Sequence, residues 1–175
     1  LDFYELFPEK FNNKTNGITH RRWLIKSNPE LTKLLKSTIG DEFIKDPTEL
    51  IKLENHLDDN ILDSLYEIKL KNKQKLAEEI YKQRGIVVNP NSIFDVHVKR
   101  IHAYKRQTLN CLRIMDLYNR LLENPDLDIV PRTFIFSGKS APGYRLAKNI
   151  IQLINAIAEK INNDPIVKDK IKVIM

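Results

Sequence analysis

The hydrophobic pattern of residues 86–175 switches repeatedly between two periods, and this switching constrains the fold more than any other feature. Phe94, Val96 and Val98 occupy alternate positions, which is the period of a β-strand. The whole pattern predicts three strands alternating with two helices, at 93–98, about 105–123, 133–137, 144–162 and 171–175. Strand–helix–strand units form right-handed crossovers on a parallel sheet. The sequence therefore predicts an α/β fold built on a parallel sheet.

Residues 1–85 carry helix start and stop signals in place of strand patterns. Asn28-Pro29 and Asp46-Pro47 each place proline at the first helical position behind a capping residue, and Glu49 stands where a capping box needs it. Helices are predicted to begin near Thr19, Asn28, Asp46 and Asp58, with the first ending near Ser27, the second at Gly40 and the last at Gly85. We expect a mostly helical lead-in segment at 1–85, with an Asn-rich loop at 8–18, followed by an incomplete α/β unit at 86–175.

The composition is that of a globular protein, and it excludes several kinds of site. Of the 175 residues, 42% are hydrophobic and 30% are charged, which is ordinary for such a protein. The 29 Lys and Arg against 23 Asp and Glu give a net charge of +6, which permits a nucleic-acid partner without requiring one. Cys111 is the single cysteine, so an intramolecular disulfide and a multi-thiolate metal site are excluded. We predict a buried thiol and no metal site.

The apolar runs and the ends of the chain indicate where the protein is located and whether the chain is part of a longer one. No run reaches 18 apolar residues, and the first residues lack the basic-then-apolar order of a signal peptide. We therefore expect no membrane partner and a cytoplasmic setting. The third strand begins at Ile171 and the chain stops at Met175, although a parallel strand is normally covered on both faces. This pattern predicts a piece of a longer protein.

A cluster of cations stands between the first predicted strand and the helix after it. Lys99, Arg100, Lys105 and Arg106 lie at a junction where the helix N-terminus already carries about half a positive charge. Two such cations about 6 Å apart repel by about 3 kcal/mol at an effective dielectric constant of about 20. A phosphate-type anion would relieve this repulsion, so we interpret the junction as a phosphate site. From spacing alone, a solvated basic turn remains the alternative.

The two histidines beside the junction are interpreted as structural. His97 lies between valines on the predicted strand and is expected to be hydrogen-bonded, and His102 is also expected to be structural. Gly138-Lys139 lacks the full spacing of a nucleotide-binding phosphate loop, so no nucleoside triphosphate is assigned there.

Several motifs together resemble the α-glucan phosphorylases, the glycogen, starch and maltodextrin phosphorylase family. The motifs are Asn13–Thr19, Arg21–Leu24, Phe94–Gln107, Gly138-Lys139 and Ala141–Tyr144, and their order and spacing also match. The resemblance covers essentially the whole chain and corresponds to the beginning of the family's C-terminal domain. It implies a partial Rossmann-like (GT-B type) parallel sheet with helices on both faces, preceded by a helical segment.

The resemblance also implies an activity. Members of the family catalyse reversible phosphorolysis of terminal α-1,4-glucosyl units and release glucose 1-phosphate. They carry pyridoxal 5′-phosphate as a Schiff base on a lysine, and the phosphate of this cofactor donates and accepts a proton beside the substrate phosphate. The expected partners of the intact protein are inorganic phosphate, glucose 1-phosphate, an α-1,4-glucan and a second copy in a homodimer, with no nucleic acid.

Site residues are carried over from the matching motif positions. Arg100 matches the arginine that grips the substrate phosphate, and Lys105 matches the lysine between the two phosphates; both are expected to be catalytic. The other assignments are Lys99, Lys105 and Trp23 for the cofactor, Asn16, Tyr104 and Arg100 for the substrate, and Tyr144 as an aromatic near the entrance. The departures from the family pattern are His20, Ala103 and Ser137, and none of them removes a cation.

The resemblance places essential parts outside this chain. The cofactor lysine is expected downstream of Met175, and the domain that forms much of the glucan channel is expected upstream. We therefore expect the isolated chain to be inactive. Three alternatives stay open: a piece of another GT-B glycosyltransferase, a basic nucleic-acid-binding module, and a helical oligomerisation or scaffolding element.

Overall fold

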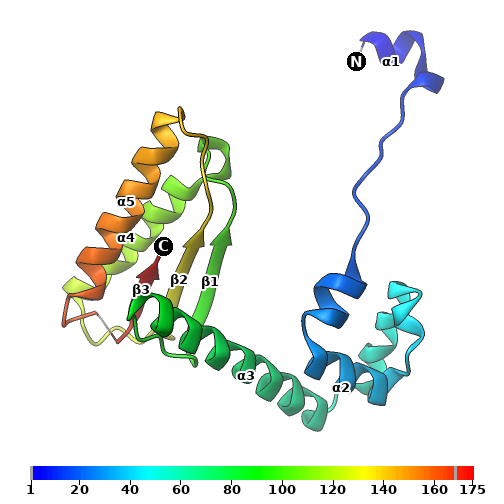
Figure 1. Ribbon diagram of the computed structural model, residues 1–175, viewed down its shortest axis with the longest axis horizontal. Coiled ribbons are helices and arrows are strands. Elements are labelled where there is room, and N and C mark those ends of the chain that lie inside the picture. The colour runs from blue at the N-terminus through cyan, green and yellow to red at the C-terminus, as the bar shows by residue number, and fades with distance from the viewer. Residues whose placement is uncertain (1, 168) are drawn as a thin grey trace. The chain divides into compact units, whose positions relative to one another are not determined.

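A computed structural model describes residues 2–167 and 169–175 and confirms the α/β class (Figure 1). The chain divides into two compact units, Leu1–Lys69 and Leu70–Met175, and the division falls within helix α3 (Asp59–Arg84). The boundary that the sequence predicts between residues 85 and 86 stays a prediction. None of the described helices is both long enough and apolar enough to cross a membrane.

The first unit consists of short helices and turns. They are α1 (Asp2–Leu6), η1 (Pro8–Lys10), η2 (Arg21–Lys26), α2 (Pro29–Ile39), η3 (Glu42–Ile44), η4 (Pro47–His56) and the start of α3. The predicted limits of α2 are confirmed: Asn28 Oδ1 accepts a hydrogen bond from Leu31 N at 3.4 Å, and Gly40 ends the helix at φ +80°. Leu35 and Phe43 are buried in this unit.

One predicted helix start of the first unit is confirmed and one predicted contact is wrong. The helix predicted near Thr19 begins there as a π-helix: Thr19 O accepts from Arg22 N at 3.2 Å and from Trp23 N at 3.0 Å. The ring of the cap residue His20 bonds to Ile44 O at 3.0 Å. The capping box at η4 does not form. The Glu49 carboxylate pairs with Lys52, while Asp46 Oδ1 accepts hydrogen bonds from both the amide and the hydroxyl of Thr48.

The second unit is a three-stranded parallel sheet with two crossover helices. Its elements after α3 are β1 (Ile93–Val98), η5 (Ala103–Lys105), α4 (Gln107–Glu123), β2 (Arg132–Ser137), α5 (Arg145–Asn162) and β3 (Ile171–Ile174). The strand order is β1-β2-β3, with Val96 opposite Ile135 and Phe134 opposite Val173. The predicted strands and helices of this half are confirmed to within about two residues.

The two faces of the sheet are covered differently. Helices α4 and α5 lie together on one face, as expected when consecutive crossovers step in the same direction (Figure 1). The core on this side is formed mainly by Ile101, Cys111, Ile114, Leu121, Phe134, Phe136, Ala147, Ile150, Ile154, Ile161, Ile171 and Val173. On the opposite face, α3 supplies Lys73, whose ammonium lies 4.7 Å from the ring centroid of Phe94 and donates to Ser92 O.

The outer edge of β3 is closed by a side chain. Asn162, the last residue of α5, accepts a hydrogen bond from Val173 N at 2.9 Å and donates one to Val173 O at 2.7 Å. One side-chain amide thus satisfies both backbone groups of a residue on an edge strand, which otherwise presents unpaired N–H and C=O groups.

The segments that leave β1 and β2 remain in contact beyond the ends of the strands. Lys99 N donates to Ser137 O at 3.0 Å, and Ile101 N donates to Lys139 O at 3.2 Å. At Gly138, an added Cβ would lie 2.1 Å from Lys99 O. This close approach requires glycine, and it joins the two loops at the carboxyl end of the sheet.

The buried position of Cys111 predicts an unreactive thiol. Its side chain is fully buried, and burial raises the pKa of the thiol to about 11. Because the thiolate is the reactive species, iodoacetamide at pH 8 should leave Cys111 unmodified in the folded protein and alkylate it after unfolding. Mass spectrometry of the peptide that contains Cys111 measures this, and equal labelling in both states would contradict the prediction.

A methyl group at Gly138 should disrupt the contact between the two loops. Gly138→Ala forces either Lys99 or the loop after β2 to move, and we expect an unfolding free energy lower by about 1–3 kcal/mol. Gly143→Ala is the matched control, since no atom lies within 4 Å of a Cβ built there. Thermal unfolding of both variants compares them, and equal midpoints would show that the close approach is unimportant.

Candidate functional site

The loop 99–106 carries exposed cations at the carboxyl end of the parallel sheet. Lys99, Arg100 and Arg106 are exposed, and Lys105 is half-buried. Within residues 2–167 and 169–175, none of these four side chains forms an ion pair with a carboxylate. Ligands of open α/β sheets bind at this edge, so the uncompensated charge stands where an anion is expected.

Two of the hollows beside this loop contain the predicted site residues that the loop carries. The first, which we call the lysine hollow, measures about 480 Å³ and is lined by Val96, His97, Val98, Lys99, Tyr104, Lys105 and Arg106. The second, the arginine hollow, measures about 310 Å³ and is lined by Arg100, Ile101, His102, Lys139, Ser140, Ala141 and Tyr144. The structure thus brings Lys99, Tyr104 and Lys105 together and places Arg100 in the neighbouring hollow with Lys139.

The lysine hollow has a charged rim over an apolar wall. Val96 and Val98 of β1 supply the wall, and both are more than half exposed. The Lys105 ammonium lies 4.5 Å from the ring centroid of Tyr104, a cation–π contact that holds this ammonium beside the hollow. Such a combination of cations and apolar surface suits a ligand that has an anionic group attached to a flat apolar body.

Gln107 holds the backbone of the loop through two hydrogen bonds. This residue opens α4 and is 0% exposed. Its Nε2 donates to Arg100 O at 3.1 Å, and its Oε1 accepts from His102 N at 3.4 Å. The sequence interpretation missed this role. The available signal was that Gln107 falls in the same helical register as Cys111 and Ile114, where a buried residue is expected.

Two aromatic side chains support the outer part of the loop. The Tyr144 hydroxyl, from the start of α5, accepts a hydrogen bond from Ala103 N at 3.2 Å. The His102 ring lies 4.5 Å from the ring of Tyr104 and 4.9 Å from that of Tyr144, measured between centroids. His102 therefore has the structural packing role that the sequence predicts.

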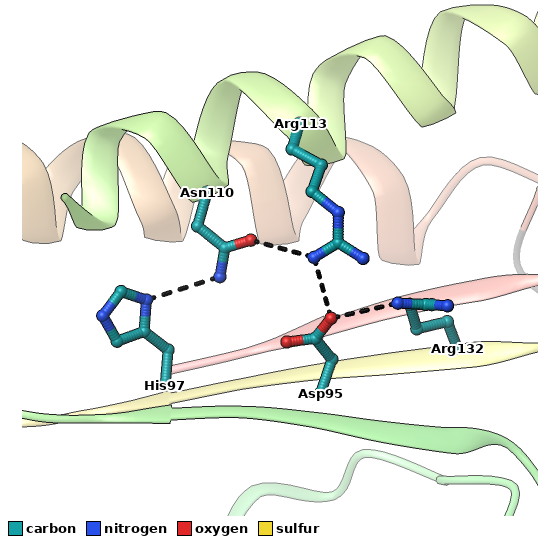
Figure 2. A network of polar contacts seen from close by, with 5 residues as sticks. All are labelled: Asp95, His97, Asn110, Arg113 and Arg132. Carbon is teal, nitrogen blue, oxygen red and sulfur yellow. Dashed lines mark hydrogen bonds and ion pairs between the residues drawn. The ribbon is translucent and has the colours of Figure 1, made fainter.

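A polar network attaches β1 to α4 next to the loop (Figure 2). Asp95 accepts from Arg113 at 2.8 Å and from Arg132 at 3.2 Å, and Asn110 Oδ1 accepts from Arg113 at 3.5 Å. Asn110 Nδ2 donates to His97 Nδ1 at 3.4 Å, so the predicted hydrogen-bonded role of His97 is confirmed. The sequence interpretation missed Asp95, because its two arginine partners lie 18 and 37 residues away along the chain.

Two predicted ligand residues belong to the first unit. Asn16 is exposed, and Trp23 is 73% exposed with the Arg22 guanidinium 5.7 Å from its ring centroid. Their predicted roles toward substrate and cofactor stay predictions. In the part of the chain that the structure describes, no group of three His, Cys, Asp or Glu side chains is arranged to hold a metal ion.

Comparison with known proteins places the whole chain in a family. The sequence model of the carbohydrate phosphorylases matches residues 1–175. The chain is 55% identical to glycogen phosphorylase of Bacillus subtilis (strain 168) over 174 residues, which covers 99% of this chain and 22% of that protein. It is 53% identical to glycogen phosphorylase of Chlamydia pneumoniae and 50% identical to the muscle form of Oryctolagus cuniculus, again over 99% of this chain and 21% of each relative. The chain therefore spans about a fifth of the length of these curated relatives and belongs to the carbohydrate phosphorylase family.

Proposed function

We propose that this chain is part of an α-glucan phosphorylase that releases glucose 1-phosphate from terminal α-1,4-glucosyl units with inorganic phosphate. The single observation that carries the proposal is the loop 99–106, which presents four cations without carboxylate partners at the ligand-binding edge of a parallel sheet. The family and the names of the relatives support it. Both favour it over another GT-B glycosyltransferase or a nucleic-acid-binding module.

Two anions are proposed to occupy the two hollows. Arg100, in the arginine hollow, offers a planar guanidinium that binds the substrate phosphate with two parallel hydrogen bonds. Lys105, in the lysine hollow, offers a point charge that lies between the substrate phosphate and a second phosphate. Cations on both sides of one short loop offset the mutual repulsion of two phosphates, and they also stabilise negative charge that develops as the glycosidic bond breaks.

The residues of the lysine hollow fit pyridoxal 5′-phosphate. Lys99 and Lys105 are suitable donors for its phosphate, and the Val96 and Val98 wall suits an apolar ring. When bound, this cofactor would supply a phosphate group that acts as a proton donor and acceptor beside the substrate phosphate. Trp23 is proposed to pack near the cofactor ring, while Asn16 and Tyr104 are proposed to hydrogen-bond hydroxyl groups of the glucosyl unit.

The intact protein is proposed to be a homodimer in the cytoplasm. In that reducing setting the single thiol, Cys111, remains a buried packing residue.

Replacing Arg100 should affect phosphate chemistry and leave glucan binding intact. In the full-length protein, Arg100→Ala removes the guanidinium that binds substrate phosphate, and we expect turnover to fall about 10²- to 10³-fold. Phosphorolysis kinetics with varied phosphate, together with a separate glucan-binding measurement, check this. Arg120→Ala, which removes an exposed arginine farther along α4, should leave both unchanged. Weaker glucan binding with undiminished turnover at saturating phosphate would contradict the role of Arg100.

The isolated chain should be catalytically inactive. It spans about a fifth of its relatives, and the proposed reaction needs a Schiff-base lysine and a glucan channel that we expect in the remainder. Incubation of the 175-residue chain with glucan, phosphate and pyridoxal 5′-phosphate should release no glucose 1-phosphate, whereas the full-length protein should release it. Product formed by the isolated chain would refute this expectation.

A further inference from the structure

A buried side-chain amide lies directly beneath the cationic loop. Gln107 has no exposed surface, and its two polar atoms both bond to the loop backbone: Nε2 donates to Arg100 O, and Oε1 accepts from His102 N. These two backbone groups flank Ile101, whose side chain is 2% exposed and belongs to the core. One amide therefore holds the loop on both sides of its core anchor.

The chemistry of this position requires a neutral amide. The side chain must donate to a carbonyl and accept from an N–H at once, which a carboxylate or an aliphatic side chain of similar size does not do. Both bonds are partly buried, and a backbone group that loses its partner in such a place is disfavoured, so the loop would move toward solvent if the amide were removed.

Both residues that Gln107 holds line the arginine hollow, and the second of them leads into the turn that carries Lys105. On one side, the Arg100 peptide is held by Gln107 and by the Ile101 N to Lys139 O hydrogen bond. On the other side, His102 O accepts from Lys105 N at 3.0 Å, so the turn that carries Lys105 starts from the residue that Gln107 holds. The side chains of Arg100 and Lys105 extend from a backbone that is hydrogen-bonded at both points, and this backbone sets the separation between them.

We propose that Gln107 is a positioning residue of the anion site, whose amide sets the spacing between Arg100 and Lys105. This spacing determines how far apart two phosphates are held, and the inference therefore rests on the proposed function. Gln107 itself touches neither phosphate. A displacement of about 1 Å in such a site costs about 10²-fold in rate.

The test replaces the amide in the full-length phosphorylase. Gln107→Leu should lower kcat/KM for inorganic phosphate by about tenfold to a hundredfold, with the KM for glucan changed less than twofold. The matched control is Asn162→Leu, because Asn162 also bridges a backbone N–H and C=O, but at the outer edge of β3. The control should lower the thermal unfolding midpoint while phosphate and glucan kinetics stay at the wild-type values.

A second pair of variants tests the role of Gln107 if the leucine variants fail to fold. Gln107→Glu retains the acceptor for His102 N but directs an oxygen at Arg100 O, so phosphate kcat/KM should fall at least tenfold, while Asn162→Asp should leave it unchanged. An unaltered phosphate kcat/KM in a folded Gln107 variant overturns the inference, as does an equal fall in kcat/KM for the Asn162 variant. Arg100→Ala is measured in parallel: if it too leaves phosphate kinetics unchanged, the proposed function itself fails.

Discussion

The close approach of the two backbone segments that leave β1 and β2 is the constraint on which the site depends. Gly138 lies so near Lys99 O that a Cβ would overlap it, and the hydrogen bonds that flank this contact extend the pairing beyond the strands as far as Ile101 and Lys139. Because the segments stay together, Arg100 and Lys139 line one hollow although they belong to different crossovers. A side chain at position 138 would separate the loops and open that hollow.

The loop is held almost entirely by neutral groups, and this has an electrostatic consequence. Gln107, the Tyr144 hydroxyl and backbone carbonyls supply its hydrogen bonds, and no carboxylate among the described residues pairs with its four cations. A glutamate or aspartate in these places would add negative charge beside the cations and partly neutralise them. Neutral supports keep the loop ordered and leave its positive charge available for an anion.

Local signals predicted much of the fold, because each depended on neighbours in sequence. The change of period located the strands and helices of residues 93–175, and the Asn28 cap with Gly40 located α2. The capping box at η4 failed because an unexpected partner intervened: Glu49 pairs with Lys52 and not with the start of the helix.

The candidate site was predictable in part for the same reason. Its cations are adjacent in sequence, so their clustering was visible, whereas their division between two hollows depends on how the loop folds. The roles of Gln107 and Asp95 were missed because their hydrogen-bond partners cannot be identified from the sequence. The fold brings these partners into contact with them.

The contrast between two groups of arginines supports the assignment of the loop as the anion site. Arg113 and Arg132 share Asp95, and Arg113 also donates to Asn110, so Arg113 joins β1 to α4 and Arg132 joins β1 to β2 (Figure 2). Arg100 and Arg106, a few residues away on the loop, have no such partner in the described part of the chain. The two guanidinium groups that fasten β1 to its neighbours are both paired with the Asp95 carboxylate. The loop cations lack such a carboxylate, so an anionic ligand can supply their counter-charge.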